Sequence, residues 1–210
     1  MAIRKSIAAV LTGDIVNSTA MTAARERTLV KGLKKVLPAD QTSFYRGDSF
    51  QVFLREAEGA LRTALICRTM AISLTEDDAV RGDVRISIGV GEVKLPVKMP
   101  EAARGDAFFL SGRGLDDIEE TEEQLSIRSG HALADIGFEV MANYLDAIYR
   151  DMTVKQAVVL LGLLQGQTQQ HIALKIKKSQ STVSQLTNAG RWPEIERLLQ
   201  QFEMLINQIV

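Results

Sequence analysis

The sequence predicts an α+β protein in which a mixed domain, residues 1–149, is followed by an all-helical domain, residues 150–210. Strand and helix patterns alternate throughout the first segment, whereas no strand pattern occurs in the second. The charge divides at the same point, because residues 150–210 carry seven Lys and Arg against four Asp and Glu. Their net charge of +3 leaves −4 for residues 1–149, since the whole chain carries −1. A mildly acidic body with a basic helical end is typical of a sensor joined to a nucleic-acid-binding module.

The first elements are predicted from apolar patterning and turn residues. "SIAAVLT" at 6–12 is short and continuously apolar, as a buried strand is. Residues 20–37 repeat apolar side chains at helical spacing, and Pro38 follows the end of that helix. "TSFYRGDSFQVFL" at 42–54 consists of two strand patterns joined by a turn, which predicts a hairpin.

The rest of the first domain continues the alternation. We expect a helix over 57–74, a strand over 83–93, a helix over 105–120, a strand over 124–129 and a closing helix over 138–149. The order of strands and helices is that of the split βαβ, or ferredoxin-like, arrangement. It predicts an antiparallel sheet with its helices packed on one face.

The composition is that of an ordinary soluble protein. Apolar residues make up 46% of the chain and charged residues 24%, which excludes a disordered or fibrous class. The longest apolar run, "AVVLLGLL" at 157–164, is far shorter than the roughly 20 residues of a membrane span, and the N-terminus has no signal-peptide pattern. We therefore expect a cytoplasmic protein without membrane contact. The single cysteine, Cys67, excludes an intramolecular disulfide and fits a packed thiol.

Two aspartates stand at predicted strand ends. Asp14 follows the first strand, and Asp48 lies in the hairpin turn, which a split βαβ places beside that strand. Two neighbouring carboxylates repel unless a proton or a cation lies between them, and Mg²⁺ takes one or two carboxylates together with substrate phosphates. The pattern predicts a Mg²⁺ or Mn²⁺ site that holds a phosphate ligand. The alternative is that both aspartates only cap turns, since Gly-Asp is common in turns.

Ser18 and Thr19 follow at the expected start of the next helix. Free backbone N–H groups and the helix dipole favour a phosphate at such a position. A competing interpretation makes the hairpin "RGDSFQVF" at 46–53 an RNA-binding strand. That interpretation is disfavoured because Asp48 occupies a position where an aromatic ring would stack on a base.

The segments "LTGDIVNST", "YRGDSFQVF", "VRISIGVGEV" and "GDAFFLSGRGL" occur in the order and approximate spacing of the blocks of class III nucleotide cyclases, which the chain resembles over residues 5 to about 120. The resemblance implies an elaborated ferredoxin-like palm in which Asp14 and Asp48 hold two metal ions. It also implies that Arg113 contacts the transferring phosphates. A solvated helix residue beside Asp116 and Asp117 is the alternative for Arg113.

The chain departs from the cyclase pattern at two positions. Phe109 stands where the cyclases have an asparagine that helps the transferring phosphates, and Phe44 stands where they have the base-selecting lysine. Phe44 could stack on a base but could not hydrogen-bond to it. Because loss of one positioned donor costs roughly 10²–10³ in rate, we do not expect a purine cyclase of ordinary efficiency, although metal and nucleotide binding could persist.

The C-terminal segment has the pattern of a helix-turn-helix. "QTQQHIALKIKKSQSTVSQLT" at 167–187 gives two short helices, with the small Ala173 at their crossing and Ser179 as an N-cap. It resembles the helix-turn-helix of sigma-factor and LuxR-type regulators, with 179–188 as the recognition helix. Together with the cyclase-like blocks it also resembles the small bacterial SatD-like family. The residues expected to contact double-stranded DNA are Lys175, Lys177, Lys178, Ser179, Gln180, Ser181, Thr182, Ser184 and Gln185. A helical hairpin with a solvated basic loop is the alternative.

The last segment, "RWPEIERLLQQFEMLINQIV", is an amphipathic helix with a broad apolar stripe. The stripe must be covered either by its own chain or by a second copy, and we expect a homodimer. These observations together predict a DNA-binding transcriptional regulator whose weakened cyclase-like domain binds a metal–nucleotide or a related phosphate ligand. The alternative is an active nucleotide cyclase or nucleotidyl transferase of unusual base preference, with the helix-turn-helix as a docking module.

Overall fold

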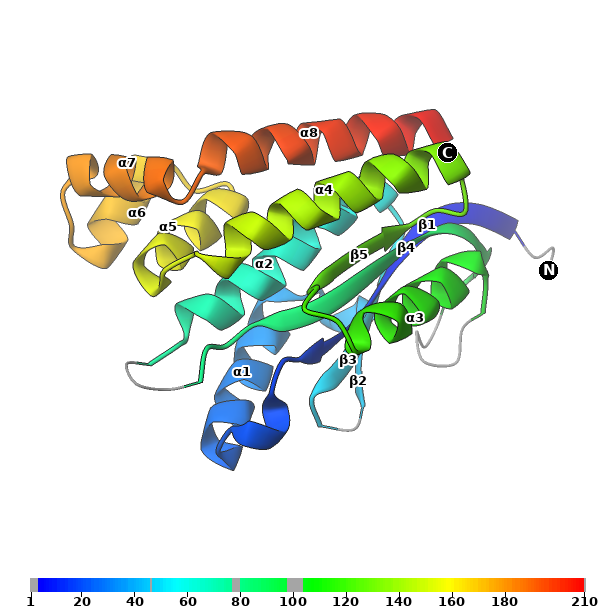
Figure 1. Ribbon diagram of the computed structural model, residues 1–210, viewed down its shortest axis with the longest axis horizontal. Helices are drawn as coiled ribbons and strands as arrows, with labels where there is room; N and C mark the ends of the chain where they lie inside the picture. Colours follow the sequence, from blue (N-terminus) through cyan, green and yellow to red (C-terminus); the bar gives the residue numbers. More distant parts are fainter. Residues whose placement is uncertain (1–3, 46, 77–79, 98–103, 210) are drawn as a thin grey trace.

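The computed structural model describes residues 4–45, 47–76, 80–97 and 104–209 (Figure 1). Within these residues one sheet has the strand order β2-β3-β1-β4-β5. Its strands are β1 (Arg4–Ile15), β2 (Thr42–Tyr45), β3 (Ser49–Leu54), β4 (Val84–Leu95) and β5 (Leu125–Arg128). The helices are α1 (Ala23–Val36), α2 (Ala60–Ser73), α3 (Asp106–Glu119), α4 (Ala132–Arg150), α5 (Val154–Leu164), α6 (Gln169–Ile176), α7 (Gln180–Ala189) and α8 (Trp192–Ile209).

The first four strands confirm the ferredoxin-like arrangement. β1 lies between β3 and β4 and is antiparallel to both, and β2 pairs with β3 as the predicted hairpin. The prediction of a wholly antiparallel sheet is wrong at β5, which runs parallel to β4. The connection explains the difference, because a strand reached through a crossover helix, here α3, runs parallel to its neighbour.

Helices cover both faces of the sheet, which corrects the prediction that they share one face. Alternate residues of β1 enter different clusters, since side chains alternate across a strand. Ala9 and Leu11 join the core formed with α1 and α2, whereas Ala8 and Val10 pack with Phe108 of α3. Figure 1 shows α3 on the side of the sheet opposite α2 and α4.

The helix α3 approaches β4 closely because glycines line the contact. A Cβ atom built at Gly89 would lie 2.2 Å from the carbonyl oxygen of Ala107 and 2.4 Å from the backbone nitrogen of Ser111. Beside this contact the hydroxyls of Thr12 and Ser111 hydrogen-bond at 2.9 Å. The helix is therefore held at backbone distance from the sheet on the face that also carries Asp14.

The C-terminal helices share the core of the sheet domain. Leu160 of α5 and Phe202 of α8 belong to the same buried cluster as Leu11 of β1. The rings of Phe138 in α4 and Phe202 lie 5.6 Å apart. The predicted boundary at residue 149/150 coincides with the end of α4, and buried side chains are continuous across it.

The apolar stripe predicted for the last helix is covered mainly by its own chain. Ile195, Leu199, Phe202 and Ile206 of α8 are buried in the shared core. Among the described residues no helix combines the length and the apolar character needed to cross a bilayer.

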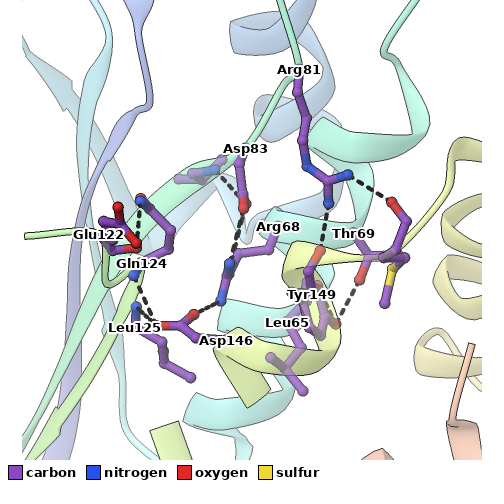
Figure 2. A network of polar contacts seen from close by, with 12 residues as sticks. Leu65, Arg68, Thr69, Arg81, Asp83, Glu122, Gln124, Leu125, Asp146 and Tyr149 are labelled. Atoms are coloured by element: carbon purple, nitrogen blue, oxygen red, sulfur yellow. Dashed lines mark hydrogen bonds and ion pairs between the residues drawn. The ribbon is translucent and has the colours of Figure 1, made fainter. Parts of the chain in front are cut away.

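A buried arginine connects the elements of this core near the end of β1 (Figure 2). The guanidinium of Arg68 in α2 donates to both carboxylate oxygens of Asp83, at 3.1 and 2.9 Å, and also to Asp146 of α4. The second oxygen of Asp146 accepts the backbone N–H groups of Gln124 and Leu125, at 2.9 and 3.3 Å. The network therefore joins α2, α4, the start of β5 and the segment that enters β4.

Two backbone contacts extend this network. The N–H of Val16, just beyond β1, donates to the carbonyl of Asp83 at 3.1 Å. Arg81 donates to the carbonyl of Met152 at 2.7 Å, between α4 and α5. The end of β1 and the entrance to the C-terminal helices are therefore both attached to the segment 81–83.

Candidate functional site

The fold brings Asp14 and Asp48 together, as predicted. Asp14 stands near the end of β1, directly opposite Ser49 of β3, and Asp48 precedes Ser49 in the β2–β3 turn. The backbone N–H of Ile15 donates to the carbonyl of Asp48 at 3.2 Å and attaches the turn to β1. Gly47 allows this turn, because its φ of 90° lies in the left-handed region.

The two carboxylates have different surroundings. The pKa of Asp14 is raised from its ordinary value by burial and by the negative charges of Asp48 and Glu119, while Arg85 acts in the opposite direction. Asp48 accepts hydrogen bonds instead, from the hydroxyl of Ser18 at 2.6 Å and from that of Ser49 at 3.3 Å. The charged form of Asp14 is therefore disfavoured, chiefly by burial.

Arg85 completes this cluster and was not among the predicted site residues. It lies opposite Asp14 in the β1–β4 register, with 3.5 Å between its Nη1 and the Asp14 Oδ2. Its Nε is buried and has no hydrogen-bond partner among the described residues. The signal that could have found it is strand pairing, because an arginine early in the strand 83–93 faces the end of the first strand once the two are aligned antiparallel.

Ser18 and Thr19 do not stand at the start of an α-helix, which corrects that prediction. They belong to a three-residue 3-10 turn, Ser18–Ala20, whereas α1 begins at Ala23. Thr22 is its N-cap, and its side chain accepts the N–H of Arg25 at 3.3 Å. Ser18 nevertheless reaches the site through its bond to Asp48, and a phosphate contact by Ser18 or Thr19 remains a prediction.

Arg113 and Phe109 lie on the outer side of α3. The face of this helix toward the sheet includes the buried Ala107, Ser111 and Gly114, whereas Phe109 and Arg113 are exposed. The guanidinium carbon of Arg113 stands 5.5 Å from the centre of the Phe109 ring. The fold therefore turns Arg113 away from the sheet, and its contact with phosphates stays a prediction.

Phe44 lies on the opposite face of the sheet from Asp14. It pairs with Phe50 across β2 and β3, with 5.8 Å between ring centres, and both rings pack with the core on the side of α1 and α2. The Nζ of Lys34 lies 5.0 Å from the centre of the Phe44 ring. Stacking of Phe44 on a base held at Asp14 and Asp48 is therefore excluded by its position in the sheet.

The donors of this cluster fit a divalent cation that keeps part of its water. No group of three or more His, Cys, Asp or Glu side chains suited to a metal occurs in the described part of the chain. A pair of carboxylates is enough for Mg²⁺ when phosphate and water supply the remaining oxygens. Burial raises the pKa of Asp14 and so makes its charged form costly, although Arg85 lies beside it, and a bound cation would reduce this cost. Cys67 is fully buried, which confirms the packed thiol.

The basic residues of the C-terminal segment lie on and beside two short, closely joined helices. Residues Lys177–Ser179 connect α6 to α7, with Lys177 in the left-handed region at a φ of 55°. The predicted cap is confirmed, since the Ser179 hydroxyl accepts the N–H of Thr182 at 3.1 Å. Ala173 and Val183 are buried between the two helices and α5. The exposed predicted residues are Lys175, Lys177, Lys178, Ser179, Gln180, Ser181 and Gln185, and those partly exposed are Thr182 and Ser184.

Comparison with known proteins identifies no family. No protein-family model matches the chain, and no curated protein is similar to it in sequence. The resemblance to the SatD-like family therefore stays an expectation.

Several solved structures are similar to part of the chain. A bacterial light-regulated adenylyl cyclase aligns with 60% of this chain and 44% of its own length, at 15% identity and a TM-score of 0.47. The guanylyl cyclase domain of a fusion protein from the aquatic fungus Blastocladiella emersonii aligns with 55% of this chain and 78% of its own, at 16% identity and a TM-score of 0.43. The guanylyl cyclase Cya2 aligns with 56% of this chain and 73% of its own length, at 13% identity and a TM-score of 0.38.

Proposed function

We propose that this protein is a DNA-binding regulator whose sheet domain binds a divalent cation together with a phosphate-bearing ligand such as a nucleotide. The observation that carries the ligand-binding part of the proposal is the juxtaposition of Asp14 and Asp48 at one end of the sheet, beside Arg85. When bound, the cation would add positive charge beside Asp14 and Asp48 and neutralise the phosphates of the ligand. Arg85 lies where its guanidinium can meet a phosphate once a cation takes its place beside Asp14.

DNA binding is supported by the surface of α6 and α7. A recognition helix must expose polar side chains to base edges, and the turn before it must offer cations to the phosphates. The helix α7 exposes Gln180, Ser181 and Gln185, and three lysines precede it. No acidic residue occurs between Lys175 and Arg191. This surface therefore meets the phosphate backbone without like-charge repulsion.

Fluorescence anisotropy of a labelled random duplex, measured at several salt concentrations, tests this part. Replacing Lys175, Lys177 and Lys178 together by Gln should weaken binding and make the dependence of log K on log salt shallower by about 2 to 3, roughly 0.9 for each phosphate that the variant no longer neutralises. The matched control replaces Lys31, Lys34 and Lys35 of α1, which lie in the other domain. Equal weakening of DNA binding in both triple variants would remove the assignment to α6 and α7.

Equilibrium dialysis against each nucleoside triphosphate, with and without Mn²⁺, tests the sheet domain. We expect retention of nucleotide only when the cation is present, and its loss in Asp14→Asn and in Asp48→Asn. Asp116→Asn on the exposed side of α3 is the matched control and should bind as the wild type does. Retention that is independent of Mn²⁺, or unchanged in the Asp14 variant, would contradict the proposed site.

An active nucleotide cyclase or nucleotidyl transferase is the second candidate, because the same two aspartates could hold the metals of that reaction. The positions of Phe44 and Phe109 argue against it, since neither provides a polar contact to a nucleotide at Asp14 and Asp48. Release of pyrophosphate from any nucleoside triphosphate in the presence of Mn²⁺, abolished by Asp14→Asn, would favour the enzyme. Binding of a nucleotide without release of pyrophosphate would favour the regulator instead.

A further inference from the structure

The outer surface of α4 and α8 is an uncovered apolar face. Eight large apolar side chains are exposed among the described residues, and five of them lie on these two helices: Leu133, Ile136, Val140, Tyr144 and Met204. The four on α4 follow one another at helical spacing and therefore form a single stripe. We call this surface, with Gly137 and the neighbouring residues of α8, the α4–α8 face.

A groove of about 420 Å³ runs between the two helices beside this stripe. Gly137, Val140 and Tyr144 line one side, and Met204 and Leu205 line the other. Among the described residues that line it, the polar side chains apart from Tyr144 are Gln201 and Gln208, and none is charged. A surface rich in Met, Tyr and aliphatic residues and poor in charge has the composition of the centre of a protein interface.

We infer that the α4–α8 face binds the same face of a second copy of this chain, so that the protein is an isologous homodimer. The area supports this occupant. The exposed fractions of the five side chains correspond to on the order of 500 Å² of apolar surface, in the upper part of the roughly 300–600 Å² of the largest patch on a typical monomer. Two such faces, together with their polar rims, reach the roughly 1,200–2,000 Å² of a stable interface.

The shape and charge of the face also suit self-pairing. In a two-fold contact a residue beside the axis meets its own symmetry mate, so a charge in the middle of the stripe would face a like charge. Residues 133, 136, 137 and 140 carry none, and the guanidinium of Arg191 lies 5.0 Å from the centre of the Tyr144 ring at the end of the stripe, away from its middle. The exposed side chains of Ile136 and Val140 form a ridge on α4. In the dimer this ridge packs into the groove beside Gly137 of the other copy. Val140 lies near the middle of the stripe, close to the two-fold axis.

Sedimentation equilibrium from micromolar to millimolar concentration tests the dimer. The wild type should approach 46.2 kDa, twice the chain mass of 23.1 kDa. Val140→Glu and Val140→Lys should each stay at the monomer mass, because like charges would meet at the axis. Mixing the two variants should restore the dimer, since opposite charges then face each other across the same contact. This rescue also shows that both variants are folded.

Leu174→Glu on α6 is the matched control, because Leu174 is 74% exposed and lies outside the face. It should dimerise as the wild type does, and its failure to do so would overturn the assignment. Persistence of the dimer in either Val140 variant would also overturn it. A wild type that stays at the monomer mass at every concentration would overturn the dimer itself and leave the face to another protein or to an apolar small molecule. None of these outcomes depends on the binding of DNA or nucleotide.

Discussion

Ionisation of Asp14 costs stability in the folded protein. Its folded-state pKa is raised above the ordinary 3.8, chiefly by burial and then by Asp48 and Glu119, and Arg85 compensates this only in part. The unfolded chain therefore releases the proton more readily than the folded chain does. Stability is lost as the pH rises from about 3.8 through the raised pKa, and the loss is complete above it. A cation bound at Asp14 would offset this cost.

Asp14→Asn should therefore raise the melting temperature at neutral pH in the absence of divalent cations. The amide keeps the shape of the carboxylate, its oxygen can still accept from Arg85, and the cost of the charge is removed. We expect a gain of about 1–2 °C near pH 7, corresponding to roughly 0.5 kcal/mol in a chain of this size. Below pH 3.8 the gain should vanish, because wild-type Asp14 is then protonated as well. Differential scanning calorimetry of both proteins between pH 3 and pH 7 measures the difference in melting temperature. A lower melting temperature of Asp14→Asn at neutral pH alone would mean that the ion pair with Arg85 stabilises the wild type by more than the burial of the charge destabilises it.

At the scale of the elements, the contact between α3 and β4 fixes the face that carries Asp14. Its closeness depends on Gly89, where a side chain would collide with the backbone of α3 rather than with a movable side chain. Spacing within 83–93 predicts the strand, but it does not tell which face a later helix will cover. The prediction that all helices share one face failed for this reason.

Gly89→Ala should lower the free energy of unfolding by about 1–3 kcal/mol, because α3 must move away from β4 to admit the methyl group. Gly112→Ala in α3 is the matched control, since a Cβ there meets no atom within 4 Å. It should be neutral or should stabilise the protein by up to about 1 kcal/mol through helix propensity. Urea unfolding of the wild type and both variants measures these changes in the free energy of unfolding. Equal stability of the two would show that α3 is not held at backbone distance.

At the scale of the whole molecule, the elements were largely predictable and their contacts less so. The order of strands and helices, the proximity of Asp14 to Asp48 and the Ser179 cap followed from local patterns and from the known neighbours in a split βαβ. The partner of Asp14, Arg85, depends on a strand register that one sequence does not specify. Which residues cover the apolar stripe on α8 also depends on tertiary packing, which local patterns do not specify. In the structure this packing joins the C-terminal helices to the core near Arg68.

This shared core predicts that the chain unfolds as one unit although its composition changes at residue 150. Trp192, the single tryptophan, reports on α8, whereas far-ultraviolet circular dichroism reports on all helices and strands. The two signals should follow the same urea transition, because loss of α5 or α8 exposes the core beneath the sheet. An earlier fluorescence transition, with most of the secondary structure retained, would instead establish residues 150–210 as a separate folding domain.

The most direct test of the ligand site is the thermal stability of the protein with Mg²⁺ alone, a nucleoside triphosphate alone and both together. A site in which Asp14 and Asp48 hold the cation and the cation holds the phosphates predicts that only the combination stabilises strongly. The expected shift is about 5–10 °C when the ligand is at 100 times its Kd. It should disappear in Asp14→Asn and Asp48→Asn and persist in Asp116→Asn. A shift caused by nucleotide without cation, or an equal shift in all three variants, would contradict the account.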